Sequence, residues 1–229
     1  MKIQTLIILL VIFLCNCKQN ENKDTYSKPE LPPDFATIGA LLDSIHVEDQ
    51  KYRGETDSIY QEFGWDSEEM RNHWKKISKA DSSNLVIIEQ ILEKHGWLSP
   101  EEIGSKANST LFLVIQHSNQ ETQEKYLPMM KQAVKEGKAN SRSLALLEDR
   151  VGLGKGELQV YGSQIGTDQE TGERYVLPLI DPENVNERRA KVGLGSIEDY
   201  ISRWNLEWDV EEYKKKLPKW IEKLKSQKR

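Results

Sequence analysis

Charged and hydrogen-bonding side chains occur in this sequence at helical positions where the apolar pattern calls for a hydrophobic residue. On the first expected helix, apolar residues from Ile38 to Ile45 mark one face, and Asp49 occupies the next position of that face. Gln116 and His117 follow directly on a short apolar run that we expect to be buried. Burying such groups without partners is costly, so we expect them to contact one another or a ligand.

Two further expected helices show the same feature. Asp149 and Arg150 flank the apolar stripe of one helix, and Arg188 and Arg189 lie between the inward-facing valines of the other. Three arginines against Asp49 and Asp149 leave a positive surplus. Because a guanidinium donates two hydrogen bonds to a carboxylate or a phosphate, this surplus predicts a polar cleft for a small anionic or glycan-like ligand.

The same residues support three kinds of function. The first is binding of a small ligand or of a partner protein in the polar cleft. The second is a hydrolase in which His117 or Asp149 acts as general base and an arginine, Arg188 or Arg189, stabilises an oxyanion. The third is a structural protein whose polar side chains pair internally and only fix helix packing. No Ser, Thr or Cys is obviously paired with His117, which disfavours covalent catalysis and leaves activation of water.

The segment 158–180 departs from the helical pattern and predicts a β-hairpin around the turn sequence TDQETGE. Strict alternation places Tyr161 and Gln164 on opposite faces of the first strand. A bulge at Gly162 would bring the two side chains to one side, which adds both to the candidate ligand site. The alternative for Tyr161 is a core tyrosine with a bonded hydroxyl. Pro178 predicts that the second strand lies at an edge.

Several classes of protein are disfavoured by missing motifs. The four histidines lack an HExxH arrangement or any cysteine partner, so we expect no metal site. There is no GxSxG motif, and the string GLGKGE lacks the spacing of a phosphate-binding loop, so no cofactor is expected. A net charge of −5 without a basic stripe argues against nucleic acid as partner.

Helix boundaries are well marked along the chain. Asp66 and Glu69 form an expected capping box before Met70, Trp74 and Ile77, which share one helix face. The other boundary signals are Ser99 with Pro100 and Glu102, Asp181 with Pro182, Asp209 with Glu212, and the glycines Gly96, Gly137 and Gly193. These signals predict a mainly α fold, a compact bundle of about eight helices with one β-hairpin at about residues 158–180.

The N-terminus predicts export and anchoring to a membrane. Residues 1–17 combine Lys2, a short apolar run and Leu14 three residues before Cys17, as in a bacterial lipoprotein signal with Cys17 as the lipid attachment point. Both cysteines of the chain fall in this segment, so no disulfide is possible beyond it. Residues 18–33 read as a polar tether and residues 34–229 as a single globular domain. We therefore expect a lipid-anchored protein of the bacterial cell envelope, periplasmic or surface-exposed.

The last expected helix, within residues 209–229, is strongly basic on one face and apolar on the other. Its apolar stripe includes Tyr213, Leu217 and Trp220, and its lysines begin at Lys214. We interpret it as a terminal helix docked on the domain with a solvated basic face. The alternative is contact with anionic lipid headgroups.

The order of short motifs resembles a bacterial, lipoprotein-associated domain family of unknown function. The motifs are EDQKYR, HGW at 95–97, QHS at 116–118, DRV at 149–151, YGSQ at 161–164 and RRAKVGL at 188–194. Ser163 stands where that family more often has threonine. The resemblance implies no activity. It implies a polar signature of Asp49, Gln50, Arg53, Gln116, His117, Asp149, Arg150, Tyr161, Gln164, Arg188 and Arg189.

Overall fold

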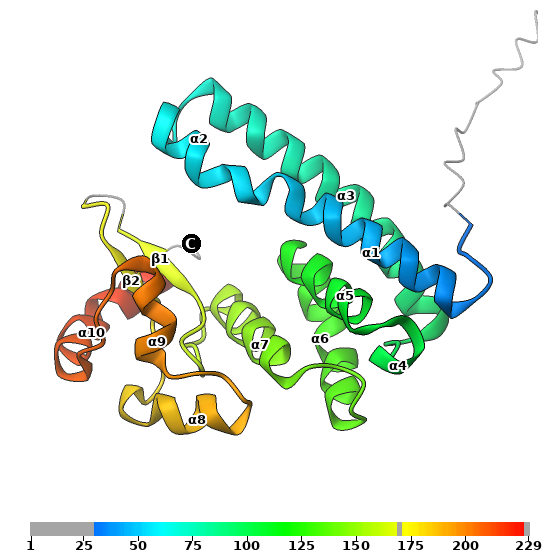
Figure 1. Ribbon diagram of the computed structural model, residues 1–229. Coiled ribbons are helices and arrows are strands. Elements are labelled where there is room, and N and C mark those ends of the chain that lie inside the picture. Colours follow the sequence, from blue (N-terminus) through cyan, green and yellow to red (C-terminus); the bar gives the residue numbers. More distant parts are fainter. Residues whose placement is uncertain (1–29, 169–170, 227–229) are drawn as a thin grey trace, which may run out of the picture.

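The computed structural model describes residues 30–168 and 171–226, and it is a mainly α-helical bundle with one two-stranded hairpin, as predicted (Figure 1). The signal segment with Cys17 and most of the tether lie outside these residues. The elements are α1 (Phe35–Lys51), α2 (Thr56–Phe63), α3 (Glu68–His95), α4 (Pro100–Ile103), α5 (Ser105–His117), α6 (Gln120–Lys135), α7 (Ser141–Lys155), β1 (Ile165–Thr167), β2 (Arg174–Val176), α8 (Val185–Lys191), α9 (Ile197–Ile201) and α10 (Val210–Ser226).

Helices α1 to α7 form the first half of the molecule around the larger core. Helices α1 and α3 run side by side, and α5 packs against both (Figure 1). Buried aliphatic side chains such as Leu42, Ile88 and Leu111 fill the space between them. A Cβ atom on Gly39 would lie 2.5 Å from the carbonyl oxygen of Ile103, so the glycine permits the close approach of α1 to the end of α4.

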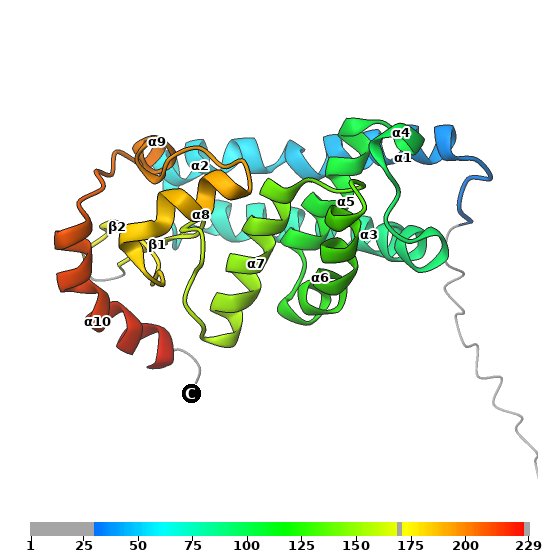
Figure 2. The same cartoon turned by 90° about the horizontal axis from the view of Figure 1, so that it is seen from below.

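The second half, from the hairpin to α10, has its own smaller core and lies at one end of the molecule beside α7 (Figure 2). Val176, Leu179 and Ile197 are buried there together with Tyr213 of α10. The ring of Trp220 stacks on Tyr175 of β2 with centroids 4.7 Å apart. Aromatic contacts of this kind add to the area that they bury, and they fasten α10 to the hairpin.

The predicted helix boundaries are largely confirmed, with one shift and one exposed side chain. Ser67, not Asp66, caps α3, because its hydroxyl accepts the N–H of Met70 at 3.0 Å. The capping box of Ser99 and Glu102 is confirmed. Met70 and Ile77 are buried as expected, but Trp74 is 43% exposed, so the apolar face of α3 is narrower than its sequence suggested.

The predicted first strand of the hairpin is wrong over residues 158–164. Only Ile165–Thr167 pairs with Arg174–Val176, in antiparallel register, and the preceding residues form a loop. Two causes are visible. Gly162 adopts φ +64°, a left-handed conformation instead of a strand bulge, and the carboxylate of Asp149 accepts backbone N–H groups that a strand would have used. Pro178 lies beyond β2.

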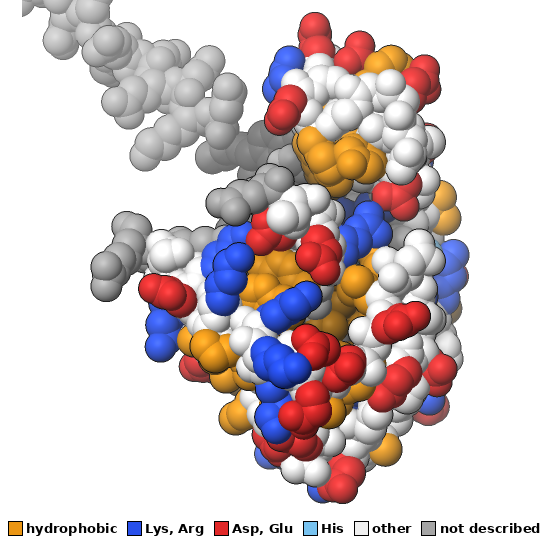
Figure 3. Space-filling model, turned by 90° about the vertical axis from the view of Figure 1, so that its left-hand side faces the viewer, with side chains coloured by type: hydrophobic (Ala, Val, Ile, Leu, Met, Phe, Trp, Pro, Cys, Tyr) orange, Lys and Arg blue, Asp and Glu red, His pale blue; other side chains and the backbone are white. Residues whose placement is uncertain are grey.

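Helix α10 docks on the second half through its apolar stripe, and its basic face is largely paired. Lys214 contacts Glu183 at 2.5 Å, and Lys223 contacts Asp168 at 3.3 Å. On the end of the molecule seen in Figure 3, basic and acidic side chains alternate around an apolar hollow. Within the described residues, no helix combines the length and hydropathy needed to cross a bilayer.

Candidate anion-binding site

The centre of the candidate site is a contact between α1 and α5. His117, the last residue of α5, has its Nδ1 atom 2.9 Å from Oδ1 of Asp49, whose side chain is fully buried. An ionised carboxylate only accepts hydrogen bonds, so Nδ1 of His117 donates to Asp49, and Nε2 lies on the far side of the ring. This is the arrangement that orients a histidine for proton transfer.

Arg53, just beyond α1, adds a positive charge to the same carboxylate. Its Nε atom lies 3.5 Å from Oδ2 of Asp49, and its Nη2 atom hydrogen-bonds Asp81 of α3. Burial alone would raise the pKa of Asp49. The hydrogen bond and charge of His117, the charge of Arg53 and a hydrogen bond from Gln50 outweigh burial and hold the pKa below its usual value. Asp49 is therefore ionised at neutral pH.

Arg150 of α7 completes the site, and no described carboxylate pairs with it. Its only hydrogen bond among the described residues is a long one, 3.3 Å from Nη1 to the backbone oxygen of Gln116, and it forms no ion pair there. Burial and the repulsion of Arg53 lower the pKa of Arg150. The two arginines and His117 line a groove of about 530 Å³ between α3, α5 and α7. Arg53 is thus paired with two carboxylates, those of Asp49 and Asp81, whereas Arg150 is partly shielded from water without an ion pair among the described residues.

Asp149, the neighbour of Arg150 in sequence, belongs to a different network. Its carboxylate is 1% exposed and accepts hydrogen bonds from the backbone N–H groups of Val160, Tyr161 and Ser163 at 2.7 to 3.2 Å. Burial raises the pKa of Asp149, against the opposing effect of these N–H groups. Its oxygen atoms are occupied by the main chain, which leaves Asp149 poorly placed to act as a general base.

Arg188 and Arg189 bind the same loop from the other side. Arg188 donates to the carbonyl oxygens of Val160 and Ile180 at 2.8 and 2.6 Å. Arg189 is 2% exposed and donates to the carbonyl oxygens of Tyr161 and Gly195, both at 2.7 Å. We call Asp149, Arg188, Arg189 and the loop 158–164 the loop network. The two arginines donate mainly to carbonyl oxygens, and Arg188 also pairs with the carboxylate of Asp181, so both hold the course of the chain.

The structure therefore divides the residues that the sequence grouped into one cleft. His117 and Arg150 line the groove, Asp49 lies buried behind His117, and Gln116 contributes only its backbone oxygen, to Arg150. Asp149, Arg188 and Arg189 lie in the loop network, together with Tyr161 and Gln164. Tyr161 has its hydroxyl 3.4 Å from Glu148, and the amide of Gln164 donates to the hydroxyl of Ser163.

Sequence reasoning missed Asp81, which the groove requires. Ile77, Asp81 and Leu85 are spaced four residues apart on α3, so Asp81 interrupts an apolar row in the same way as Asp49 does on α1. A search of the α3 sequence for charged residues within its apolar row would have found Asp81.

Asp49, Asp81 and His117 also form the one group among the described residues whose geometry could hold a metal ion. Their ligand atoms lie within 4.8 Å of one another. The guanidinium of Arg53 contacts both carboxylates and already supplies the positive charge that a metal would bring. A metal ion would have to displace Arg53, so this arrangement favours an anion beside the arginines.

Residues 42–212 match the model of a protein family described as a family of unknown function (DUF6624). The chain belongs to this family. The matched region of this DUF6624 chain contains every groove and loop-network residue named above. No curated protein and no solved structure matches the chain.

Proposed function

We propose that the groove binds the carboxylate or phosphate group of a small ligand, with Arg150 as its main anchor. The observation that carries this is the partly buried guanidinium of Arg150, which has no carboxylate partner among the described residues and lies beside a second arginine. A bound anion would offset the repulsion between Arg150 and Arg53 and would accept charge-assisted hydrogen bonds from Arg150.

A second function, hydrolysis of the bound ligand, is favoured by the pair of Asp49 and His117. In this reaction Nε2 of His117 takes a proton from a water molecule, and the buried carboxylate of Asp49 stabilises the imidazolium that forms. The arginines then stabilise the negative charge that develops on the substrate. The partners of Asp149 in the loop network make it the weaker candidate for the base.

The setting that we propose for this activity is the bacterial cell envelope, with the chain anchored through a lipid on Cys17. The support is the sequence of residues 1–17, which ends in Leu14, Cys15, Asn16 and Cys17. A Cys17→Ser variant is then expected to lose the incorporation of labelled palmitate in growing cells. Equal labelling of the variant would count against this anchor.

The binding proposal is tested by thermal denaturation of the chain in increasing concentrations of inorganic phosphate. A ligand that binds only the folded state raises the melting temperature with concentration. We expect the wild type to show this rise and Arg150→Gln to lose it. Arg142→Gln is the matched control, because Arg142 lies on the same helix, is exposed and does not line the groove. An equal rise in wild type and Arg150→Gln would overturn the proposal.

A further inference from the structure

The groove at the candidate site continues over α3 onto a second surface. Ile77, Asp81 and Leu85 of α3 line the groove with Arg53, His117 and Arg150. A second, shallower groove on α3 is lined by Arg71, Trp74, Lys75, Ser78, Lys79, Ser82 and Ser83. Three residues, Trp74, Ser78 and Ser82, belong to both.

Helical geometry explains how the two grooves are joined. Residues four apart on a helix form a row along its surface, and neighbouring rows lie side by side. The row of Trp74, Ser78 and Ser82 separates the site from the row of Arg71, Lys75 and Lys79. Two of its three side chains are small hydroxyls, so the ridge between the grooves is low. Its third member, Trp74, offers an exposed ring.

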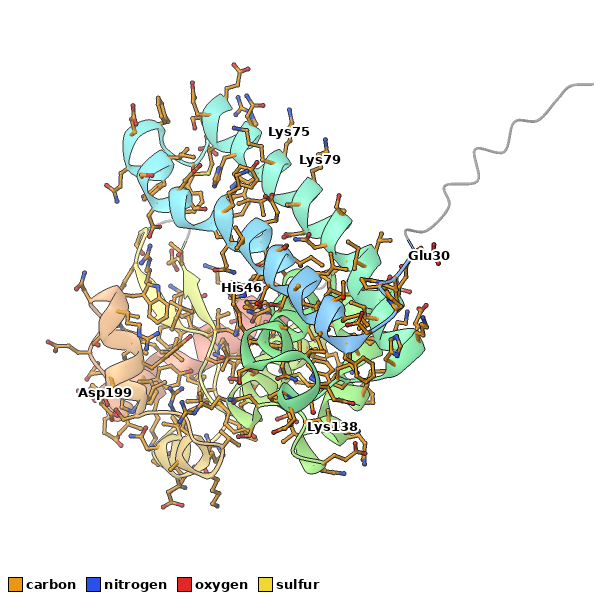
Figure 4. The ribbon with its side chains drawn as sticks, turned by 45° about the vertical axis from the view of Figure 1, so that its right-hand side comes forward. Glu30, His46, Lys75, Lys79, Lys138 and Asp199 are labelled. Atoms are coloured by element: carbon orange, nitrogen blue, oxygen red, sulfur yellow. The ribbon has the colours of Figure 1, made fainter. Side chains whose placement is uncertain are left out.

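The cations of the outer row lack counter-charges. Neither Lys75 nor Lys79 forms an ion pair within the described residues, and Arg71 donates only to the backbone oxygen of Asp66. Both lysines point away from the body of the molecule, on the outer side of α3 (Figure 4). On α10, by contrast, Lys214 and Lys223 pair with acidic residues. Arg71, Lys75 and Lys79 therefore form a row of cations beside the groove that has no ion pair among the described residues.

We infer that the ligand of this site is an extended polyanion. One anionic group binds at Arg150 in the groove, the chain of the ligand crosses the ridge at Ser78 and Ser82 beside Trp74, and a further anionic group contacts Lys75 and Lys79. This inference rests on the proposed function, because the first anionic group is the one that the groove binds. Arg150 lines only the first groove and the two lysines line only the second, so the ridge of Trp74, Ser78 and Ser82 separates the two contacts and a ligand that reaches both must extend across it.

The test compares inorganic phosphate, tripolyphosphate and a longer linear polyphosphate by titration calorimetry on the full chain. The longer polyphosphate is expected to bind the wild type more tightly than phosphate. In the double variant Lys75→Gln, Lys79→Gln its affinity falls about fivefold, as expected for two exposed charge contacts, while phosphate binding is unchanged. Lys76→Gln combined with Lys94→Gln is the control, since both lysines are exposed on α3 and line neither groove.

The outcomes separate this inference from the proposed function. If the Lys75 and Lys79 variant binds the longer polyphosphate as tightly as the wild type does, and Arg150→Gln does not, the site takes a single anionic group and the inference fails. An equal loss in the control double variant means that net charge alone attracts polyphosphate, and the inference fails again. If Arg150→Gln keeps phosphate binding, the proposed function itself is wrong.

Discussion

Asp49 and Asp149 are both buried aspartates that interrupt apolar helix faces, yet their oxygen atoms have different partners. Asp149 accepts hydrogen bonds from main-chain N–H groups of the loop network. Asp49 accepts hydrogen bonds from the side chains of His117 and Gln50 and forms an ion pair with Arg53, and two of these residues, His117 and Arg53, line the groove. Folding raises the pKa of Asp149 and lowers that of Asp49. The partners of a buried charge therefore decide, more than the residue type does, whether the residue has a structural or a chemical role.

The arginines follow the same division. Arg188 and Arg189 each donate to a carbonyl oxygen of the loop 158–164 and to other groups nearby, among them the carboxylate of Asp181, so replacing either arginine would loosen the loop. Among the described residues, Arg150 makes one long hydrogen bond, and its other donors have no partner there. Buried polar side chains that hydrogen-bond the main chain contribute to stability. Side chains with donors that have no partner can still bind a ligand.

The largest expected effect comes from Asp149→Asn, which tests the structural side of the comparison. An amide cannot accept on both sides, so the backbone N–H group of either Val160 or Ser163 would face another donor. We expect the free energy of unfolding to fall by about 3 kcal/mol, measured by urea denaturation. The control is Glu136→Gln, an exposed carboxylate that contacts Lys138 outside the loop network, for which a much smaller loss is expected. Equal losses in the two variants would remove the basis for treating the loop network as structural.

The sequence could predict the helices and most residues of the groove and of the loop network, but it could not show which residues belong to which. Helical spacing alone identified Asp49 and Asp149 as polar residues on apolar faces, and that pattern is the same for both. What divides them is the course of the loop 158–164, which wraps around Asp149 because Gly162 takes a left-handed conformation. A local alternation of residues favoured a strand there, and the buried carboxylate 14 positions earlier overrode it.

The pairing of Arg53 with Asp81 could not be predicted from the sequence, for a related reason. The two residues are 28 positions apart, on either side of helix α2, and their contact depends on how α1 and α3 turn back on each other. A spacing rule within one helix can flag each residue but not the pair. The exposure of Trp74 has the same origin, because the groove leaves that part of α3 uncovered.

An intermediate loss of unfolding free energy is expected for Asp49→Asn. Its dependence on pH distinguishes Asp49 from Asp149. Because folding lowers the pKa of Asp49 below 3.8, its contribution to stability is present above that value and is lost as the pH falls through the lowered pKa. At pH 7 the variant should lose about 1 to 3 kcal/mol of unfolding free energy. The difference from wild type should shrink in urea titrations below pH 3.8.

The matched control for this measurement is Asp57→Asn, since Asp57 is exposed and has no ion pair among the described residues. We expect this control to follow the wild type at every pH. A difference between Asp49→Asn and wild type that stays constant down to pH 2, a value well below the usual aspartate pKa of about 3.9, would show that the ionised carboxylate is not what stabilises α1 against α5.

The smallest effect on stability is expected for His117→Asn. This variant tests whether His117 has a chemical role in the groove or only a packing role. The amide of asparagine can replace Nδ1 as the donor to Asp49, so the unfolding free energy should change by less than about 1 kcal/mol. The variant has no atom in place of Nε2, so any hydrolysis that uses His117 as base should disappear while phosphate binding through Arg150 persists. His46→Asn is the control, because His46 contacts Thr110 outside the groove. If His117→Asn destabilised the chain as strongly as Asp149→Asn, the groove residues would be a packing network like that of the loop, and the division between the two regions would fail.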